Sequence, residues 1–242
     1  MKYGIISDIH SNLEALNIVL SNLKDIDKLI CLGDIVGYGP NPNECVEVIK
    51  NLSIPTVAGN HDKAVIGELS IEWFNRDAAD AVRWTQIEIS GKNLEYLKSL
   101  PIHLDFENFE IVHGSLREPV EEYITSIFEA MPTFEKMKKP LLFVGHTHVP
   151  IAIVMKKDGD FDGWMLEDNQ NIRTPEWEKV LINPGGVGQP RDGDSRASFG
   201  IYDSDKKEFT LHRIEYNIEK VQEKMRVAGL PSWLIERFAF GR

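Results

Sequence analysis

The first 58 residues alternate short apolar runs with segments whose apolar residues recur at helical spacing. Apolar runs at residues 3–7, 28–32 and 55–58 predict three buried strands. Between them, residues 12–23 and 43–52 carry apolar side chains three and four positions apart, which is typical of helices that bury one face. Parallel strands need a long crossover between them, usually a helix. This order therefore predicts a parallel sheet with crossover helices at the start of the chain.

The pattern changes twice along the rest of the chain. Residues 63–100 are mainly helical in pattern, and strand patterns dominate after residue 149. A polar, acidic stretch at residues 156–178 is expected to be an excursion from the sheet. No linker is long enough to separate domains, so residues 1–242 are expected to form one domain. Further strands are expected at residues 109–112, 141–144, 151–155, 180–182, 197–202 and 209–214, and two closing helices at residues 218–227 and 232–240.

Composition narrows the class of protein. Hydrophobic residues make up 42% of the chain, which is enough for a sizeable core. The formal net charge is −11, and because an acidic surface repels the nucleic-acid backbone, broad binding to DNA or RNA is not expected. Bound metal ions reverse the local field, so a small phosphorylated ligand remains compatible with this charge.

We expect no signal for export or membrane insertion in this chain. No apolar stretch approaches the ~20 residues that a membrane-spanning helix needs. The first residues read as the start of a strand and not as a signal peptide. The two cysteines, Cys31 and Cys45, lack zinc-type spacing and are expected to be buried thiols in a reducing compartment. We therefore expect a soluble cytoplasmic protein.

Five short polar blocks follow strand-like apolar runs, and each offers groups that bind metal ions. In open α/β sheets, functional side chains gather at the carboxyl ends of the strands, so the five blocks are expected to converge on one pocket. Five of the seven histidines of the chain fall inside these blocks. The blocks are DIH at residues 8–10, GD at 33–34, GNHD at 59–62, HGS at 113–115 and GHTH at 145–148.

The residue types in these blocks suit two metal ions. A lone histidine after a strand, or a lone Gly-Asp pair, is usually structural. Together, however, the blocks offer a set of two carboxylates, one amide and four imidazoles, with His61 and Asp62 besides, and buried Asp and His side chains need partners. Asp8 and His10 lie two residues apart, so in an extended chain both side chains can reach one ion. The set is large enough for two metals that share a bridging carboxylate.

In this order, the five blocks resemble the signature motifs of calcineurin-like metallophosphoesterases. Three further stretches, GDIVGYGPNPNECVE, HGSLREP and NPGGVGQPRDGDSRASFGIYD, are similar to the bacterial and archaeal phosphodiesterase subgroup of that superfamily. The resemblance implies a four-layer α/β/β/α sandwich, in which two mixed sheets pack face to face and helices flank them. The sequence pattern by itself shows only an α/β half followed by a β-rich half.

The resemblance also implies a role for each residue of the blocks. Asp34 would bridge two divalent transition metal ions; Mn²⁺ is the first expectation, and mixed nitrogen and oxygen ligands also admit Fe, Ni, Co or Zn. A metal-bound hydroxide would attack the phosphate group, since two adjacent ions clamp the reacting oxygens and lower the pKa of water. His61 would be the catalytic histidine that stabilises or protonates the leaving-group oxygen. The first metal would take Asp8, His10, Asp34 and His148, and the second Asp34, Asn60, His113 and His146.

Three charged residues near the blocks have two interpretations each. Asp62 either orients His61 or caps the helix that follows. Arg191 lies in a loop rich in Gly and Pro, where it either binds a substrate phosphate oxygen or forms an ordinary ion pair. Arg117, just after the fourth block, has the same two interpretations.

The sequence pattern also suggests roles for three aromatic residues, for the two histidines outside the blocks and for the last helix. Trp73, Phe74 and Trp84 either pack in the core, which is the usual case, or form a lid over a nucleoside. His103 and His212 lie outside the blocks and are expected to be structural. An apolar stripe in the last helix either docks on the chain's own core or contacts a second copy, which leaves a homo-oligomer open. The stripe consists of Trp233, Leu234, Phe238 and Phe240.

We expect a metal-dependent phosphoesterase that hydrolyses a small phosphodiester, with a nucleotide among the candidate substrates. Protein serine/threonine phosphatases of the superfamily resemble the pattern GDxVDRG, whereas residues 33–39 read GDIVGYG and lack that arginine. A monoester dianion carries about one more negative charge than a diester and needs a further cation, so the missing arginine favours a diester.

Three alternative functions remain open. A phosphomonoesterase and a dinucleoside polyphosphate hydrolase would use the same ligands. A non-catalytic protein-binding scaffold, like the metallophosphoesterase-like subunit of the retromer coat, is the alternative from another class. Such scaffolds tend to lose metal ligands or the catalytic histidine, and this chain has all seven ligands and His61, so the scaffold is disfavoured.

Overall fold

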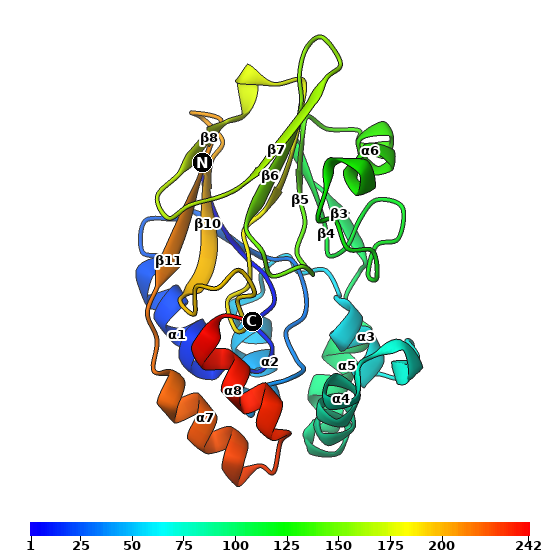
Figure 1. The fold of residues 1–242 in the computed structure, drawn as a ribbon, viewed down its shortest axis with the longest axis vertical. Helices are drawn as coiled ribbons and strands as arrows, with labels where there is room; N and C mark the ends of the chain where they lie inside the picture. Colours follow the sequence, from blue (N-terminus) through cyan, green and yellow to red (C-terminus); the bar gives the residue numbers. More distant parts are fainter.

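A computed structural model describes residues 1–242 as two mixed β-sheets with helices around them (Figure 1). The first sheet has five strands in the order β2-β1-β10-β11-β8. Only β1 and β2 run parallel in it, and the other neighbours are antiparallel. Its strands are β1 (Lys2–Ile6), β2 (Lys28–Cys31), β8 (Asn171–Arg173), β10 (Ala197–Asp203) and β11 (Glu208–Ile214).

The second sheet has six strands in the order β3-β4-β5-β9-β6-β7. Its centre, β4-β5-β9, is parallel, and β3, β6 and β7 pair antiparallel with their neighbours. The parallel centre makes β4 and β5 end at the same edge of the sheet. Its strands are β3 (His103–Asp105), β4 (Phe109–Val112), β5 (Leu141–Phe143), β6 (Ile151–Met155), β7 (Phe161–Met165) and β9 (Lys179–Asn183).

Helices cover the outer faces of both sheets and one end of the molecule (Figure 1). Helices α1 (Leu13–Asn22) and α2 (Pro42–Leu52) pack on the first sheet, and α6 (Ile127–Lys136) packs on the second. The start of α1 is fixed by Asn12, whose side chain accepts a hydrogen bond from the Ala15 amide. The other helices are α3 (Asn60–Val65), α4 (Arg76–Glu88), α5 (Gly91–Lys98), α7 (Ile218–Val227) and α8 (Ser232–Phe240), with short 3₁₀ segments η1 (Ile71–Trp73) and η2 (Thr174–Glu176).

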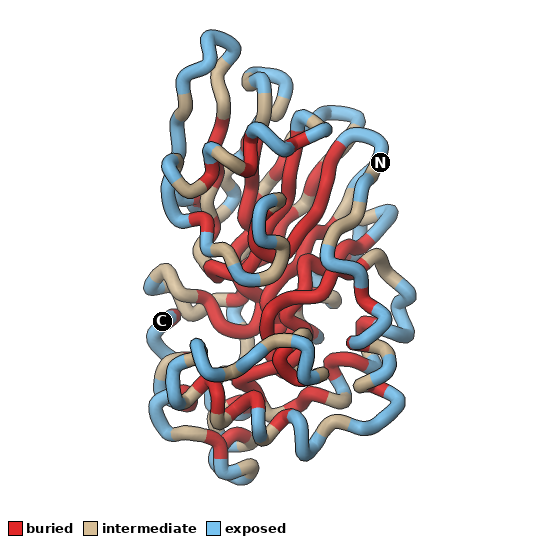
Figure 2. The backbone as a smooth tube through the Cα atoms, turned by 90° about the vertical axis from the view of Figure 1, so that its right-hand side faces the viewer, coloured by how far each residue is buried: buried red, intermediate tan, exposed pale blue.

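Alternation along the strands builds separate apolar cores between the layers. In β1, Ile5 belongs to the core between the two sheets, whereas its neighbour Ile6 belongs to the core beneath α1 and α2. In the second sheet, Phe143 faces the first sheet and Leu142 faces α6. Figure 2 shows the buried residues as a continuous band along the strands. The predicted four-layer α/β/β/α sandwich is thus confirmed.

Most predicted elements are present, but three differ from the sequence-based expectation. Residues 55–58 were expected to form a strand and contribute only one parallel bridge, between Cys31 and Thr56. The pairing consists of two hydrogen bonds, from the Cys31 amide to the Pro55 carbonyl and from the Val57 amide to the Cys31 carbonyl, and the Gly59 amide donates to Asp62 Oδ2 instead of continuing the ladder. Residues 156–178 are not a mere excursion, since they supply an edge strand to each sheet, β7 and β8. The short edge strand β3 was not predicted.

The last two helices pack mainly on the chain itself. Leu234 and Phe238 of α8 lie in an apolar cluster with Val221 of α7, so this half of the predicted stripe docks on the chain's own core. Trp233 and Phe240, in contrast, keep 59% and 64% of their surface exposed. None of the helices combines the length and the apolar character required to cross a bilayer.

Candidate metal centre and active-site cleft

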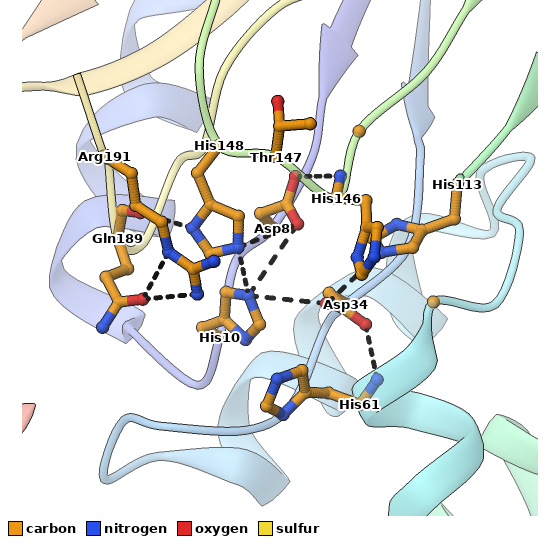
Figure 3. Close-up of polar contacts among 12 residues, drawn as sticks. Asp8, His10, Asp34, His61, His113, His146, Thr147, His148, Gln189 and Arg191 are labelled. Atoms are coloured by element: carbon orange, nitrogen blue, oxygen red, sulfur yellow. Dashed lines mark hydrogen bonds and ion pairs between the residues drawn. The ribbon is translucent and has the colours of Figure 1, made fainter. Parts of the chain in front are cut away.

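Four strands from both sheets deliver the candidate ligands. Asp8 and His10 follow β1, and Asp34 follows β2, both in the first sheet. In the second sheet, His113 follows β4 and the fifth block follows β5. The site therefore lies where the carboxyl ends of these strands meet (Figure 3), as expected for an α/β fold. Asn60, the seventh candidate, is the first residue of α3.

The backbone at these positions is held in an uncommon conformation. The φ angles of Asp8, His10, Asp34, His146 and His148 are 53°, 48°, 51°, 68° and 58°, all in the left-handed region. Such residues cost roughly 1–3 kcal/mol each and cluster at functional sites. Hydrogen bonds between the loops offset the strain, since the Asp8 and His10 amides donate to the Gly33 and Asp34 carbonyls, both at 3.0 Å.

The first group of ligands consists of four buried side chains, Asp8, His10, Asp34 and His148. The Nδ1 atoms of His10 and His148 donate to the carbonyls of Val36 and Gln189, at 3.1 and 2.5 Å. In neutral rings, Nε2 is then left with a lone pair. These two Nε2 atoms lie only 3.0 Å apart. Two lone pairs at this distance repel each other unless a cation lies beside them, so this arrangement fits a metal ion.

The second group consists of Asp34, His113 and His146. His113 Nδ1 donates to the Leu32 carbonyl at 2.8 Å, and His146 Nε2 donates to the Glu121 carbonyl at 3.1 Å. The remaining nitrogen of each neutral ring is again free to bind a metal. His113 Nε2 lies 3.3 Å from Asp34 Oδ2 and 3.3 Å from Asn60 Oδ1. Asn60 therefore borders this group, and Asp34 belongs to both groups.

Two carboxylate oxygens of the site lack a hydrogen-bond partner. Asp8 Oδ1 and Asp34 Oδ2 are buried and accept no hydrogen bond. Burial raises the pKa of Asp8 to about 6. Burial also raises the pKa of Asp34, but His113 and the neighbouring histidines outweigh it, so this pKa lies well below its ordinary value. Unpartnered buried carboxylates are costly, and a divalent cation would satisfy both oxygens. The donor set thus fits one metal in each group.

The imidazoles fall into two electrostatic classes. Burial lowers the pKa of His10, His148 and His146, the last to about 3, so these rings stay neutral, as metal ligands must be. Burial also lowers the pKa of His113, but the Asp34 carboxylate outweighs this and raises it to about 9. A proton on His113 therefore occupies the position that a metal would take.

His61 lies beside the ligands without joining either group. Its amide donates to Asp34 Oδ1 at 2.9 Å, which ties the start of α3 to the shared carboxylate. Its ring packs 4.4 Å from the Tyr38 ring and 5.0 Å from the Phe74 ring, measured between centroids. Burial lowers the pKa of this ring to about 4, so it is neutral at neutral pH. His61 also lines a cleft of about 400 Å³ that opens beside the ligands.

Asp62 acts on the backbone and does not contact His61. Its Oδ2 accepts from the Gly59 amide, and its Oδ1 accepts from the Ile35 and Val36 amides. Of the two interpretations from the sequence, the structure supports the helix cap. The same contacts fix the loop that follows Asp34.

The two arginines differ in their partners. Arg117 pairs with Glu122, which is the ordinary ion pair. Arg191 donates to Tyr38 Oη at 3.0 Å and to Gln189 Oε1 at 3.1 Å, and no carboxylate lies within ion-pairing distance of it. Figure 3 shows its guanidinium beside His148 and Gln189. A partly buried cation without an anion is well placed to bind a substrate oxygen.

Other residues of the site were missed or assigned differently from sequence. Tyr38 was missed as a residue of the site. The glycines on either side of it were a signal that this segment passes close to other parts of the chain: a Cβ on Gly39 would lie 2.4 Å from the His10 carbonyl oxygen. Core packing, the usual case, is wrong for Trp73, which is 89% exposed. Phe74 lines the cleft, and Trp84 packs against the cluster of α7 and α8.

His103 is structural, because its Nε2 atom contacts Glu110 Oε1 at 3.3 Å.

Comparison with known proteins agrees with this geometry. An uncharacterized protein of Methanocaldococcus jannaschii is 42% identical over an alignment of 252 positions, which covers 99% of this chain and 98% of that protein. The crystal structure of a metallophosphoesterase from Sphaerobacter thermophilus matches with a TM-score of 0.91 and 44% identity, over 100% of this chain and 99% of the other. A hypothetical protein of Pyrococcus horikoshii, 21% identical over 100% and 98% of the two chains, shares the fold with a TM-score of 0.82.

The family follows from a match that spans most of the chain. The calcineurin-like phosphoesterase superfamily domain covers residues 1–207, which include all seven candidate ligands and His61. The near full-length relatives extend the similarity over the rest of the chain. The chain therefore belongs to the calcineurin-like phosphoesterase superfamily.

Proposed function

We propose that this protein hydrolyses a small phosphodiester with the help of two divalent metal ions. The observation that carries the proposal is the pair of buried ligand groups that share Asp34 and contain unpartnered carboxylate oxygens and facing lone pairs. Asp8, His10, Asp34 and His148 would hold one ion, and Asp34, Asn60, His113 and His146 the other. Such ions, when bound, offset the charge of a phosphate group and lower the pKa of water.

The chain's own residues would position the substrate and support the departure of its leaving group. His61 is neutral and borders the cleft, so its N–H group can donate a hydrogen bond to the leaving oxygen or pass a proton to it. Arg191 would hold a non-bridging phosphate oxygen, because its guanidinium has no carboxylate partner. The buried setting of the ligands limits the access of bulk water to the reacting group.

The balance of charge favours a diester over a monoester. Beyond the candidate metals, Arg191 is the cation that we assign to the phosphate group, while Arg117 is engaged by Glu122. A monoester dianion carries about one more negative charge than a diester and gains more from a second cation. We therefore infer a phosphodiesterase, with a phosphomonoesterase as the second candidate because Arg191 could supply part of the missing charge.

The test compares two substrates with the same leaving group at one pH and one metal loading. Bis(p-nitrophenyl) phosphate should show a higher kcat/KM than p-nitrophenyl phosphate. Arg191→Ala should reduce hydrolysis of the monoester more than of the diester, and Arg117→Ala is the matched control with a guanidinium already paired. A tenfold preference for the monoester, equal to about 1.4 kcal/mol of transition-state stabilisation, would rule out the diesterase.

A further inference from the structure

The cleft beside His61 adjoins the second group of ligands, since His146 lines it, and it extends over residues that belong to neither group. Its volume is about 400 Å³, which lies in the range of pockets that hold small organic molecules. Its lining includes Trp73 and Phe74, from the segment between α3 and α4, and Tyr123. His61 and His146 also line it, so a group bound in the cleft would adjoin the candidate metal centre.

Aromatic side chains line the cleft, and two of them keep much of their surface exposed. Trp73 is 89% exposed and Tyr123 is 47% exposed, which is unusual for large aromatic side chains. Tyr123 already stacks on His146, with ring centroids 3.9 Å apart. The Phe74 ring packs against His61 at 5.0 Å. A flat ring bound between these walls would gain stacking contacts right beside the catalytic histidine.

The wall that carries Trp73 is an ordered element. Ser70 accepts from the Glu72 amide at 3.3 Å and starts η1, and the Phe74 amide donates to the Ile71 carbonyl at 3.1 Å. Asn75 Oδ1 accepts from the Ala78 amide at 2.9 Å and starts α4. Trp73 is therefore held between two caps. The exposure of its side chain therefore results from the conformation of a capped backbone segment and not from an irregular loop.

The polar groups of the cleft exclude one class of ligand and suit another. Glu121 is the one acidic side chain among the lining residues, and no lysine or arginine lines the cleft. The nearby Arg117 pairs with Glu122 instead. Arg191 donates to the lining residue Tyr38, but it is assigned to the reacting phosphate group. A leaving group with further phosphates would therefore meet the Glu121 charge without a cation of its own. The Asn75 amide nitrogen and the Glu121 carboxylate, in contrast, can donate to and accept from the edge of a heteroaromatic base.

We propose that the cleft binds the leaving group of the substrate and that this group is an uncharged nucleoside whose base stacks on Trp73. The proposal rests on the proposed function and names its substrate class, a nucleotide diester. In the reaction, the oxygen of water bonds to phosphorus, and the bond from phosphorus to the nucleoside oxygen breaks. One proton of the water ends on that oxygen, so the products are a phosphate monoester and a free nucleoside. Trp73 determines specificity and takes no part in the chemistry.

Binding can be tested without turnover on metal-free protein. Adenosine should quench the fluorescence of Trp73, taken as the difference between the wild type and Trp73→Phe, and the quenching should saturate. Ribose, which lacks the base, should not quench it. Because this measurement needs no catalysis, it tests the cleft even if the protein hydrolyses no phosphodiester, and the two proposals can then fail separately. Absence of saturable quenching by adenosine, or equal quenching by ribose, overturns the inference.

Inhibition provides the matched comparison of variants. On metal-loaded protein, adenosine should compete with bis(p-nitrophenyl) phosphate, and its Ki should rise about tenfold or more in Trp73→Ala. Trp73→Phe should keep most of the affinity, because it keeps a stacking face. The control is Ile87→Ala, which changes a side chain that is 81% exposed on α4 but does not line the cleft. An unchanged Ki in Trp73→Ala, or the same rise in Ile87→Ala, contradicts the proposal.

The charge argument has its own test. A dinucleoside monophosphate should be hydrolysed with a higher kcat/KM than a dinucleoside tetraphosphate with the same bases. Both carry two nucleosides, so the comparison isolates the added phosphates in the leaving group. A tenfold preference for the tetraphosphate would show that the cleft accepts a polyphosphate chain, and the uncharged leaving group would then be wrong.

Discussion

Asp34 is the residue on which both candidate metal positions depend. Its Oδ2 is within 3.5 Å of His10 Nε2 and within 3.3 Å of His113 Nε2, and no hydrogen bond satisfies it. Asp34→Asn removes the negative charge that both ions would share, so the metal content should fall in both positions at once. Activity should fall by at least about 10-fold to 100-fold. Elemental analysis of the purified variant measures the first effect and steady-state kinetics the second.

The control for this variant is Asp25→Asn, an exposed aspartate outside the site. It should retain both the metal content and the activity. If Asp34→Asn kept two ions per chain, Asp34 would not be a bridging ligand, and the assignment of the two groups would have to change.

His61 borders the ligands, so its loss should affect turnover and spare the metals. His61→Ala should keep the metal content and lower kcat by roughly 10²–10⁴-fold, since donation to the leaving oxygen is lost. The loss should be larger for an alkoxide leaving group, which needs a proton, than for nitrophenolate. His103→Ala, which changes a histidine bound to Glu110, is the matched control and should leave kcat unchanged. An equal loss with both leaving groups would assign His61 another role.

At the scale of elements, the turn after β2 shapes the site through its glycines. Gly37 has φ +103°, and a Cβ there would lie 2.5 Å from His61 Nδ1 and 3.1 Å from His10 Nδ1. Gly67 has φ +79°, but a Cβ there would meet open space. Alanine at either position should lower the free energy of unfolding by about 1–3 kcal/mol, because positive φ strains a side-chain-bearing residue.

These two variants therefore separate backbone strain from displacement of the His61 ring. Only Gly37→Ala should also lower kcat/KM, because its methyl group pushes against the rings of His61 and His10. Denaturant unfolding gives the stability of each variant, and kinetics on one diester gives its activity. Equal activity of the two variants would show that the ring of His61 can move without consequence.

At the scale of the whole molecule, metal binding should link stability to pH. In the absence of metal, His113 keeps its proton up to about pH 9, because the Asp34 carboxylate outweighs the effect of burial on its pKa. A metal must displace this proton, so raising the pH from 7 to 9 removes a competitor and strengthens binding. A ligand that binds only the folded state at 100 times its Kd adds about 2.7 kcal/mol to the free energy of unfolding.

The measurement is the difference in Tm between metal-loaded and chelated protein along a pH series. That difference should be roughly 5–10 °C for a chain of this size and should grow between pH 7 and pH 9. The chelated protein at each pH is the control for other titrating groups. A difference that shrinks over this range would contradict displacement of a proton from His113.

The sequence alone was sufficient to predict the candidate ligands and most of the helices and strands. Strand and helix periodicities are local, so nearest neighbours in the chain already define which faces are buried. The blocks after the strands contain Asp and His residues. Burying these side chains without partners would be costly, so only a few roles, such as metal binding, are compatible with them. For this reason the strands and helices around Asp8, Asp34 and His113 were predicted near their observed bounds.

Tertiary structure decided what depends on partners distant in the chain. Residues 156–178 look like a polar excursion, yet β8 pairs with β11 because an open sheet edge satisfies its backbone hydrogen bonds. Tyr38 and Arg191 are separated by 153 positions and meet through one hydrogen bond. Trp73 has a large aromatic side chain of the kind that usually packs in a core, but two helix caps hold it at the surface of a cleft. No local pattern encodes these contacts, because their energy arises only when separate segments have come together.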